Sequence, residues 1–211
     1  MARPVPLTER RFRQAVLELT ARDRHLHAIV ERHGRPDFWH RAPGFPTLLL
    51  LILEQQVSLA SARAAFDKVD RRIGGVTPTG LLELSDEALR ADGFSRQKTR
   101  YARELARALV DGTLDLDGLE TLDDAGVRME LVALPGIGSW TAEVYLLSAL
   151  RRPDTWPVGD LALQVAAAEA LGLETRPSPQ ELGEIGERWR PHRATAARLL
   201  WHRYLTVRGR A

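Results

Sequence analysis

Residues 131–160 contain the feature that most constrains the fold, a sharp break between two apolar helical segments. The first segment ends in LPGIG at residues 134–138, and the second begins near Val144. Pro135 lacks the backbone N–H that a continuing helix needs, and glycines adopt backbone angles that other residues resist. The spacing therefore predicts a tight helix–hairpin–helix, whose first helix spans residues 121–134.

The same turn predicts a binding site for an anion. Gly136 and Gly138 carry no side chains, so a large anion can approach the backbone N–H groups at the start of the second helix. Those N–H groups have no partner within the helix, and the helix dipole adds positive charge there. An ordinary turn between packed helices is the alternative, because glycine and proline occur in most loops.

Composition excludes several classes of site. The 211 residues contain no cysteine, which rules out disulfides, cysteine nucleophiles, zinc fingers and iron–sulfur clusters. The six histidines show no spacing typical of a metal site, so we expect no iron, zinc or nucleotide cofactor. The net charge is only +2, yet arginine greatly outnumbers lysine. This balance fits a nucleic-acid partner, because arginine donates bidentately to phosphate.

The pattern of helix starts and stops predicts an all-α chain, and we find no convincing strand pattern. Thr8, Asp23 and Ser58 are candidate N-caps, and Ser178 begins a capping box. The longest apolar run, residues 48–53, is far shorter than the roughly 20 residues that span a bilayer. No N-terminal stretch has the pattern of a signal peptide. We therefore expect a cytoplasmic protein that does not enter membranes.

The wider sequence around the turn resembles a known family. The LPGIG turn is followed by Ser139, Trp140 and Thr141, and beyond two prolines Asp160 precedes a helix predicted over residues 161–171. This order resembles the helix–hairpin–helix, the Gly/Pro-rich loop and the aspartate of the helix–hairpin–helix DNA glycosylase superfamily. The match is best to the alkylation-repair enzymes of the DNA-3-methyladenine glycosylase II type.

The resemblance implies a two-lobed glycosylase fold with a DNA-binding cleft between the lobes. Lobe one would span about residues 45–152 and contain the helix–hairpin–helix at about 125–150. Lobe two would combine residues 1–44 with 153–211, which places Asp160 at the crossover. The resemblance also implies a bacterial-type, nucleoid-associated monomer. The sequence departs from the family's pattern in one respect here, because we expect it to lack the N-terminal β-rich domain of some relatives.

The implied chemistry is hydrolysis of the bond between an alkylated base and deoxyribose, with 3-methyladenine and 7-methylguanine as typical bases. The transition state resembles an oxocarbenium ion, so a negative charge near C1′ accelerates the reaction. Asp160 is the candidate catalytic residue, and a plain helix N-cap is its alternative role. In members that also cleave the DNA backbone, a lysine occupies the place of Trp140. Tryptophan cannot form a Schiff base, so the resemblance implies a glycosylase without lyase activity.

The resemblance also assigns residues to a base pocket and a DNA-binding surface. Trp140 and Trp201 would line the pocket, where Val144 and Leu161 replace residues that are aromatic in some relatives; Phe38 and Trp39 are candidates to substitute for them. The predicted DNA contacts are Gln55, the wedge residue Gln56, Gly136, Ile137, Gly138, Ser139, Thr141 and Arg193. Core packing is the alternative for each tryptophan, and exposed amides at a helix end are the alternative for the glutamines.

The resemblance further implies that the carbonyl groups of Val132, Leu134 and Ile137 hold a monovalent cation, Na⁺ or K⁺, as the one candidate metal site. The expected partner is double-stranded DNA that contains damaged bases. Two other functions stay open at this point. The chain could be a helix–hairpin–helix protein that grips DNA without chemistry, or a glycosylase for oxidised or deaminated bases. Asp160 with Trp140 and Trp201 distinguishes the enzyme from the binding module, which needs none of them.

Overall fold

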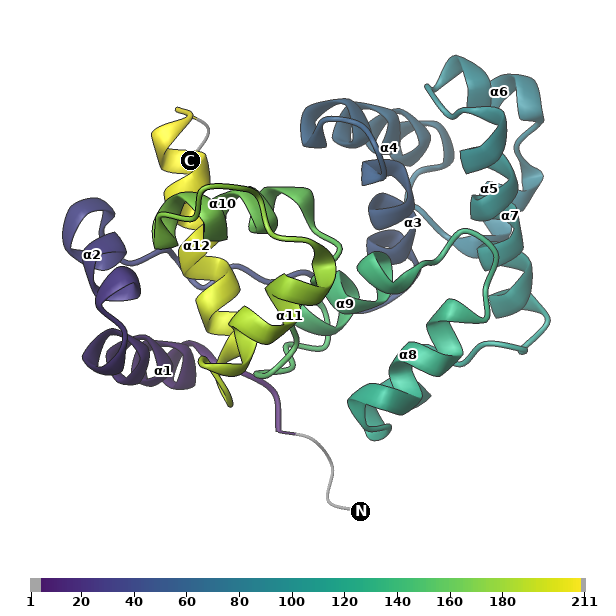
Figure 1. Cartoon of the computed structure of the whole chain (residues 1–211). Helices are drawn as coiled ribbons and strands as arrows, with labels where there is room; N and C mark the ends of the chain where they lie inside the picture. The colour runs from purple at the N-terminus through teal and green to yellow at the C-terminus, as the bar shows by residue number, and fades with distance from the viewer. Residues whose placement is uncertain (1–4, 210–211) are drawn as a thin grey trace. The chain divides into compact units, whose positions relative to one another are not determined.

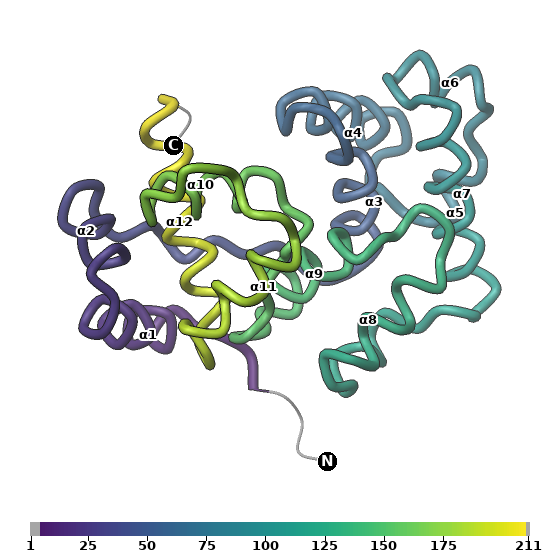
Figure 2. The backbone as a smooth tube through the Cα atoms, in the orientation of Figure 1, coloured from purple at the N-terminus to yellow at the C-terminus, as the bar shows by residue number. Residues whose placement is uncertain are grey.

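The computed structural model describes residues 5–209, and all regular elements in this part of the chain are helical, which confirms the predicted fold class (Figure 1). The chain forms two compact units, and each is described separately. Unit 1 comprises residues 41–150, and unit 2 comprises residues 5–40 and 151–209. The backbone therefore leaves unit 2, builds unit 1 and returns (Figure 2). The predicted lobe ends at 1–4 and 210–211 lie outside the described residues.

Unit 1 is built around a helix that is apolar on nearly every side. Its helices are α3 (Phe45–Glu54), α4 (Leu59–Ile73), α5 (Pro78–Glu83), α6 (Asp86–Ala91), α7 (Arg96–Val110), the short 3-10 helix η1 (Gly118–Thr121), α8 (Asp124–Val132) and α9 (Ser139–Ser148). Helix α3 packs against α4, α7 and α9, and its Leu48–Leu53 segment is buried except for half-buried Leu50. This core fixes the end of α3, and with it Gln55, next to the hairpin turn.

Unit 2 combines both ends of the described chain. Its helices are α1 (Glu9–Arg22), α2 (Arg24–His33), α10 (Leu161–Leu171), α11 (Pro179–Glu187) and α12 (Arg193–Val207). Helix α12 packs against α1, α2 and α10, and its residues 194–200 are all buried. A second anchor is Trp189, whose ring meets Trp156 edge-on at 5.2 Å between centroids. Within residues 5–209, none of the helices is both long and apolar enough to cross a membrane.

The predicted helix caps are confirmed. Thr8 and Asp23 accept backbone N–H groups at the starts of α1 and α2, and Ser58 does the same for α4. Ser178 and Glu181 form the predicted capping box of α11. Short polar side chains at these positions satisfy N–H groups that have no partner within the helix. These local signals could therefore be found without knowledge of the tertiary structure.

Two helix boundaries differ from the prediction. The first hairpin helix begins at Asp124, not at residue 121, because Asp123 accepts the N–H of Gly126 as its N-cap. It also ends at Val132, two residues before the predicted end at Leu134. The preceding residues 118–121 form the separate helix η1 instead.

Candidate functional site

Asp160 lies at the start of α10 and binds two donors through one carboxylate oxygen. Its Oδ1 accepts the backbone N–H of Leu163 at 2.7 Å and the indole Nε1–H of Trp201 at 3.0 Å. The first bond makes Asp160 the N-cap of α10, and the second reaches it from α12. The side chain is half-buried. Two donors from different helices therefore fix the orientation of this carboxylate.

Trp201 also contacts Trp39, which lies in the loop between α2 and α3. The two ring centroids are 6.0 Å apart and the ring planes meet at 43°. Trp39 is 39% exposed, while Trp201 is half-buried. The neighbouring Phe38 packs on Phe12 of α1, with 5.4 Å between ring centroids. The structure thus connects Asp160 to Trp201 and Trp201 to Trp39, while Phe38, the residue before Trp39, packs on α1.

Arg198 of α12 lies against the same aromatic side chains and is fully buried. Its guanidinium carbon is 4.8 Å from the ring centroid of Trp39 and 5.5 Å from that of Phe38. Nη1 donates to the carbonyl of Ala194 at 3.1 Å, and Nη2 lies 3.5 Å from the carbonyl oxygen of Trp39. Burial lowers the pKa of Arg198 to about 9, so the side chain is still protonated at neutral pH. We call Phe38, Trp39, Asp160, Arg198 and Trp201 the Asp160 cluster.

The two aliphatic residues predicted for the pocket have different surroundings. Leu161 directly follows Asp160 and is 58% exposed, so its side chain is accessible in unit 2. Val144 is only 7% exposed and packs within the apolar core of unit 1. Trp140, in the first turn of α9, is half-buried and packs against that core from its edge. Val144 therefore has the packing role, whereas Leu161 and part of Trp140 remain accessible.

The two hairpin glycines differ in a way that the sequence did not reveal. Gly136 has a φ of +89°, and a Cβ on it would lie 2.1 Å from Cγ of Tyr101. Both the backbone angle and the lack of space therefore require glycine at this position. Gly138 has an ordinary extended backbone, with φ −95° and ψ 179°, and a Cβ on it would meet nothing within 4 Å. The prediction that both glycines supply unusual backbone angles is therefore wrong for Gly138.

Gly138 is the N-cap of α9, whose own hydrogen bonds begin with the N–H of Ala142 donating to the Gly138 carbonyl. The N–H of exposed Ser139 precedes that bond and has no acceptor within the helix. The open space beside Gly138 leaves it approachable. Ile137 differs, because its N–H donates to Leu134 O at 3.1 Å and its side chain is buried. Its role is to anchor the turn in the core.

Gln55 ties the end of α3 to the hairpin. Its Nε2 donates to the carbonyl of Gly136 at 2.8 Å and to Oγ1 of Thr141 at 3.0 Å. Thr141 is itself buried, so this side chain acts inside the hairpin. Gln56 is fully different: it is exposed and has a φ of +58°, a strained value for a residue with a Cβ. The structure thus separates an amide that braces the turn from one that projects into solvent.

Arg193, predicted to contact DNA, forms ion pairs within unit 2. Its guanidinium donates to Asp154 and to Glu187, with Nε 3.0 Å from Asp154 Oδ1 and Nη1 3.0 Å from Glu187 Oε1. The side chain is only 14% exposed. Other arginines of the C-terminal segment are likewise paired with acids or buried, namely Arg190, Arg198, Arg203 and Arg208. Arg193 is therefore much less available to phosphate than the predicted DNA contact required.

The carbonyl groups predicted to hold a cation flank the hairpin turn. Val132 is the last residue of α8, so no later turn of that helix donates a hydrogen bond to its carbonyl oxygen. The carbonyl oxygen of Leu134 accepts the N–H of Ile137 at 3.1 Å. Carbonyl oxygens are suitable ligands for Na⁺ or K⁺, and each has a second lone pair. Within residues 5–209, no three His, Asp or Glu side chains gather as a metal site would require.

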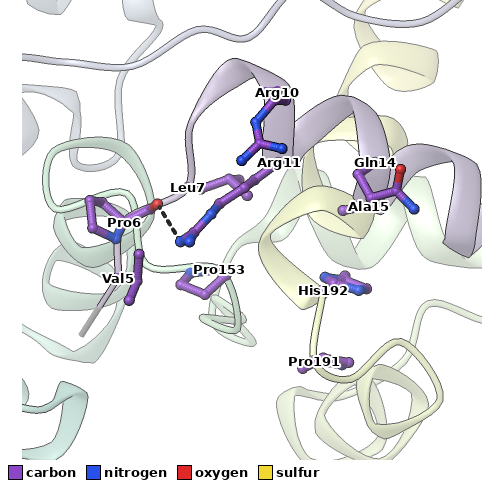
Figure 3. Close-up of a pocket in the computed structure, with 10 residues that line it drawn as sticks. All are labelled: Val5, Pro6, Leu7, Arg10, Arg11, Gln14, Ala15, Pro153, Pro191 and His192. Atoms are coloured by element: carbon purple, nitrogen blue, oxygen red, sulfur yellow. Dashed lines mark hydrogen bonds between the residues drawn. The ribbon is translucent and has the colours of Figure 1, made fainter. Parts of the chain in front are cut away.

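A cavity of about 460 Å³ lies elsewhere in unit 2 (Figure 3). It is lined by residues 5–7, by Arg10, Arg11, Gln14 and Ala15 of α1, and by Pro153, Pro191 and His192. None of these residues belongs to the Asp160 cluster or was predicted as a site residue. The cavity is therefore separate from the candidate site.

Two residues that shape the hairpin and the Asp160 cluster were not predicted from the sequence. Tyr101 of α7 packs on Gly136, but nothing in the sequence around it distinguishes it from other residues of an amphipathic helix. Arg198 could have been found from the sequence, because it is the one charged residue in segment 194–200, which otherwise contains only alanine, threonine and leucine. A lone arginine in a buried helical segment indicates a specific set of partners.

Comparison with protein families gives a match over most of the chain. The family model described as HhH-GPD superfamily base excision DNA repair protein matches residues 49–191, a range that contains the hairpin and Asp160. YfjP of Bacillus subtilis, which carries the provisional name of a DNA-3-methyladenine glycosylase, is 28% identical over 184 residues and 83% of this chain. The chain spans 64% of the length of YfjP and 39% of that of a relative from Mycobacterium tuberculosis.

Solved structures share the fold. A DNA-3-methyladenine glycosidase from Bacillus halodurans superposes with a TM-score of 0.77 at 32% identity, covering 92% of this chain and 91% of that protein. The 3-methyladenine DNA glycosylase Mag1 of Schizosaccharomyces pombe, solved with abasic DNA, gives a TM-score of 0.82 at 24% identity, covering 92% and 97%.

Proposed function

We propose that this chain, which belongs to the HhH-GPD superfamily of base excision DNA repair proteins, is a DNA glycosylase that releases alkylated bases. The reaction is hydrolysis of the N-glycosidic bond, and 3-methyladenine and 7-methylguanine are the bases we expect to be released. The observation that carries the proposal is the carboxylate of Asp160, held by the start of α10 and the indole of Trp201. The names of the similar proteins support the choice of alkylated bases.

Asp160 would act on the sugar. As the base departs, positive charge develops at C1′, and a fixed carboxylate nearby stabilises that charge or deprotonates the attacking water. Preorganisation matters here, because a carboxylate that must reorient during the reaction contributes less. The bonds from Leu163 N–H and Trp201 Nε1–H supply that preorganisation, since both act on Oδ1.

The reaction would stop at the abasic site. A glycosylase that also cleaves the backbone needs an amine that attacks C1′, and Trp140 stands where the resemblance places such a lysine. The two lysines of the chain are Lys68 and Lys98. The Nζ of Lys98 donates a hydrogen bond to the carbonyl of Leu53, near the end of α3, at 2.6 Å. We therefore propose monofunctional activity.

The accessible aromatic faces would bind the extruded base. Trp39 and Trp201 present indole rings in the Asp160 cluster, and Leu161 adds an exposed aliphatic side chain next to the carboxylate. An alkylated purine such as 3-methyladenine carries positive charge, so it stacks favourably on an electron-rich indole. Its charge also makes it a good leaving group. Both properties favour alkylated purines over neutral damaged bases.

The hairpin would hold the DNA backbone. The N–H groups at the start of α9 suit a phosphate, and a monovalent cation on the carbonyls of Val132, Leu134 and Ile137 would add positive charge at the same turn. Exposed Gln56 is the proposed wedge in the gap left by the extruded nucleotide. The partner is then double-stranded DNA with a damaged base, bound by a monomer.

The deciding experiment is a base-release panel on alkylated, deaminated and oxidised DNA under single-turnover conditions. Wild type should release alkylated purines, and Asp160→Asn should slow release by roughly 100-fold or more with little change in affinity for abasic DNA. Asp123→Asn is the matched control, because Asp123 is also an N-cap aspartate, accepting the N–H of Gly126 at 2.8 Å. Equal release rates for wild type, Asp160→Asn and Asp123→Asn would mean that Asp160 serves only as the N-cap of α10. No release from any substrate would favour a DNA-binding module.

A further inference from the structure

The burial of Arg198 needs an explanation that packing alone does not supply. Moving a guanidinium out of water costs free energy unless hydrogen bonds and other charges compensate, and an apolar residue of similar size often serves stability as well. Arg198 is fully buried, and its polar contacts within unit 2 include carbonyl oxygens and two aromatic faces. Besides the bond to Ala194 in its own helix, Arg198 contacts the segment that carries Phe38 and Trp39 through both aromatic rings and through the Trp39 carbonyl oxygen, 3.5 Å from Nη2.

The position of Arg198 on α12 gives it a second connection to the site. It lies three residues before Trp201, so both side chains extend from the same face of the helix. Trp39 therefore meets two residues of α12 at once, the guanidinium of Arg198 at 4.8 Å and the ring of Trp201 at 6.0 Å. The loop that carries Trp39 has no regular secondary structure, so side-chain contacts such as these contribute to where its ring lies.

We propose that Arg198 is a positioning residue, which holds Trp39 against Trp201 and thereby keeps the Trp201 indole on the carboxylate of Asp160. A cation near an indole face is attracted by the ring quadrupole, most strongly where water is excluded. Removing it frees the Trp39 ring to turn. Trp201 then loses the ring that packs on it, and its hydrogen bond to Asp160 loosens. For its effect on catalysis, the inference rests on the proposed glycosylase function.

The test compares Arg198→Met, Arg198→Lys and a matched control. Methionine keeps a long side chain without the charge, and lysine keeps the charge without the planar guanidinium. Arg188→Met is the control, because Arg188 also lies over an indole, 5.8 Å from the Trp189 ring centroid, but is exposed and outside the Asp160 cluster. Each variant is measured by the indole N–H resonances of its tryptophans, by single-turnover release of 3-methyladenine and by affinity for abasic DNA.

We expect Arg198→Met to shift the indole resonances of Trp39 and Trp201, assigned from Trp→Phe variants, and to leave that of Trp156 in place. Release should slow by about tenfold, because small misplacements of a reacting group are costly, while abasic-DNA affinity stays level. Arg198→Lys should restore part of the rate, and Arg188→Met should match wild type. Wild-type Trp201 resonance or wild-type release in a folded Arg198→Met protein overturns the proposal.

The indole measurement needs no activity, so it separates the two proposals. If wild type releases no base, the proposed function fails, and the resonances still decide whether Arg198 controls the position of Trp201. If Arg198→Met does not fold, Trp39→Leu is the second variant, since it removes the same packing and leaves Arg198 in place. An unmoved Trp201 resonance in that variant would refute the coupling between Trp39 and Trp201.

Discussion

The hairpin of unit 1 and the Asp160 cluster of unit 2 are built in opposite ways. The hairpin uses adjacent residues, and its binding groups are backbone N–H groups that glycine leaves accessible. The cluster draws side chains from the loop at residues 38–39, the start of α10 and the buried face of α12. A local backbone motif tolerates changes that leave its turn intact. A cluster of side chains that are far apart in the chain depends on each contact. We therefore expect a substitution in the cluster to lower activity by displacing the other side chains.

The largest expected effect is on the hairpin, from Gly136→Ala. The φ of +89° disfavours any residue with a Cβ, and the new atom would lie 2.1 Å from Cγ of Tyr101. Backbone strain and overpacking together should lower the free energy of unfolding by about 3 kcal/mol or more. Urea denaturation of wild type and Gly136→Ala measures this difference in the free energy of unfolding.

Adding Tyr101→Ala to Gly136→Ala separates the two causes. The double variant removes the overlaps with Cγ and Cδ2 of Tyr101 but keeps the backbone strain and the 2.6 Å approach to its Cβ, so Gly136→Ala should cost less in the Tyr101→Ala background than in wild type. A Gly136→Ala protein within about 0.5 kcal/mol of wild type would show that the turn adapts, against the expected overpacking cost.

The contrast explains what the sequence could predict. The turn, the helix caps and Asp160 at a helix start all depend on neighbours within a few residues, and the structure confirms those local features. The bond from Trp201 to Asp160 and the contact of Trp39 with Arg198 join residues that are far apart in the chain. No local pattern encodes such pairs. The same limit led to the overestimated accessibility of Arg193, whose partner Asp154 is far from it in the chain.

The next largest effect should come from the cluster, from Trp201→Phe. Phenylalanine keeps an aromatic ring but cannot donate to Asp160 Oδ1, which now receives the indole N–H at 3.0 Å. A hydrogen bond to a charged group is worth about 1.5–3 kcal/mol, so base release should slow by about 10- to 100-fold. Single-turnover kinetics measure it.

Trp189→Phe is the matched control for Trp201→Phe. Its indole also donates to a capping aspartate, Asp23 Oδ2, at 2.8 Å, but that residue caps α2 and lies outside the Asp160 cluster. We expect this variant to lose stability and to keep its release rate. Equal rate losses in both variants would mean that the bond to Asp160 has only a structural effect.

Acid should weaken both units, but through different contacts. In unit 1, two hydrogen bonds from Arg72 hold the pKa of Asp92 below its ordinary value of 3.8. In unit 2, burial raises the pKa of Asp23, but donors including the indole of Trp189 outweigh it and leave the pKa below 3.8. A carboxylate whose folded pKa is lowered stabilises the protein above its unfolded pKa, and that contribution is lost as pH falls through the folded pKa.

Asp92→Asn and Asp23→Asn sharpen the comparison of the two units. Each should make thermal stability less dependent on pH below about pH 4, because the removed carboxylate no longer takes up a proton on unfolding. Thermal unfolding across that range measures the slopes. A slope equal to wild type in Asp92→Asn would show that its ion pair with half-exposed Arg72 contributes little, as exposed pairs often do.

The smallest effect on stability should come from Gly138, which also gives the cleanest test of the hairpin as a backbone site. Its extended backbone suits any residue, and a Cβ would meet nothing within 4 Å. Gly138 is the N-cap of α9, where alanine is less favourable than glycine, so Gly138→Ala should lower the free energy of unfolding by about 1 kcal/mol or less. Gly138→Leu should fold equally well, yet its side chain would occupy the space through which a phosphate approaches the start of α9. We expect Leu to weaken binding of every DNA sequence alike, and Ala to weaken it less. The measurement is a binding titration on abasic and undamaged duplexes, beside urea denaturation of both variants. Unchanged affinity in a folded Gly138→Leu protein would mean that phosphate does not reach these N–H groups, and the hairpin would then serve to position α9.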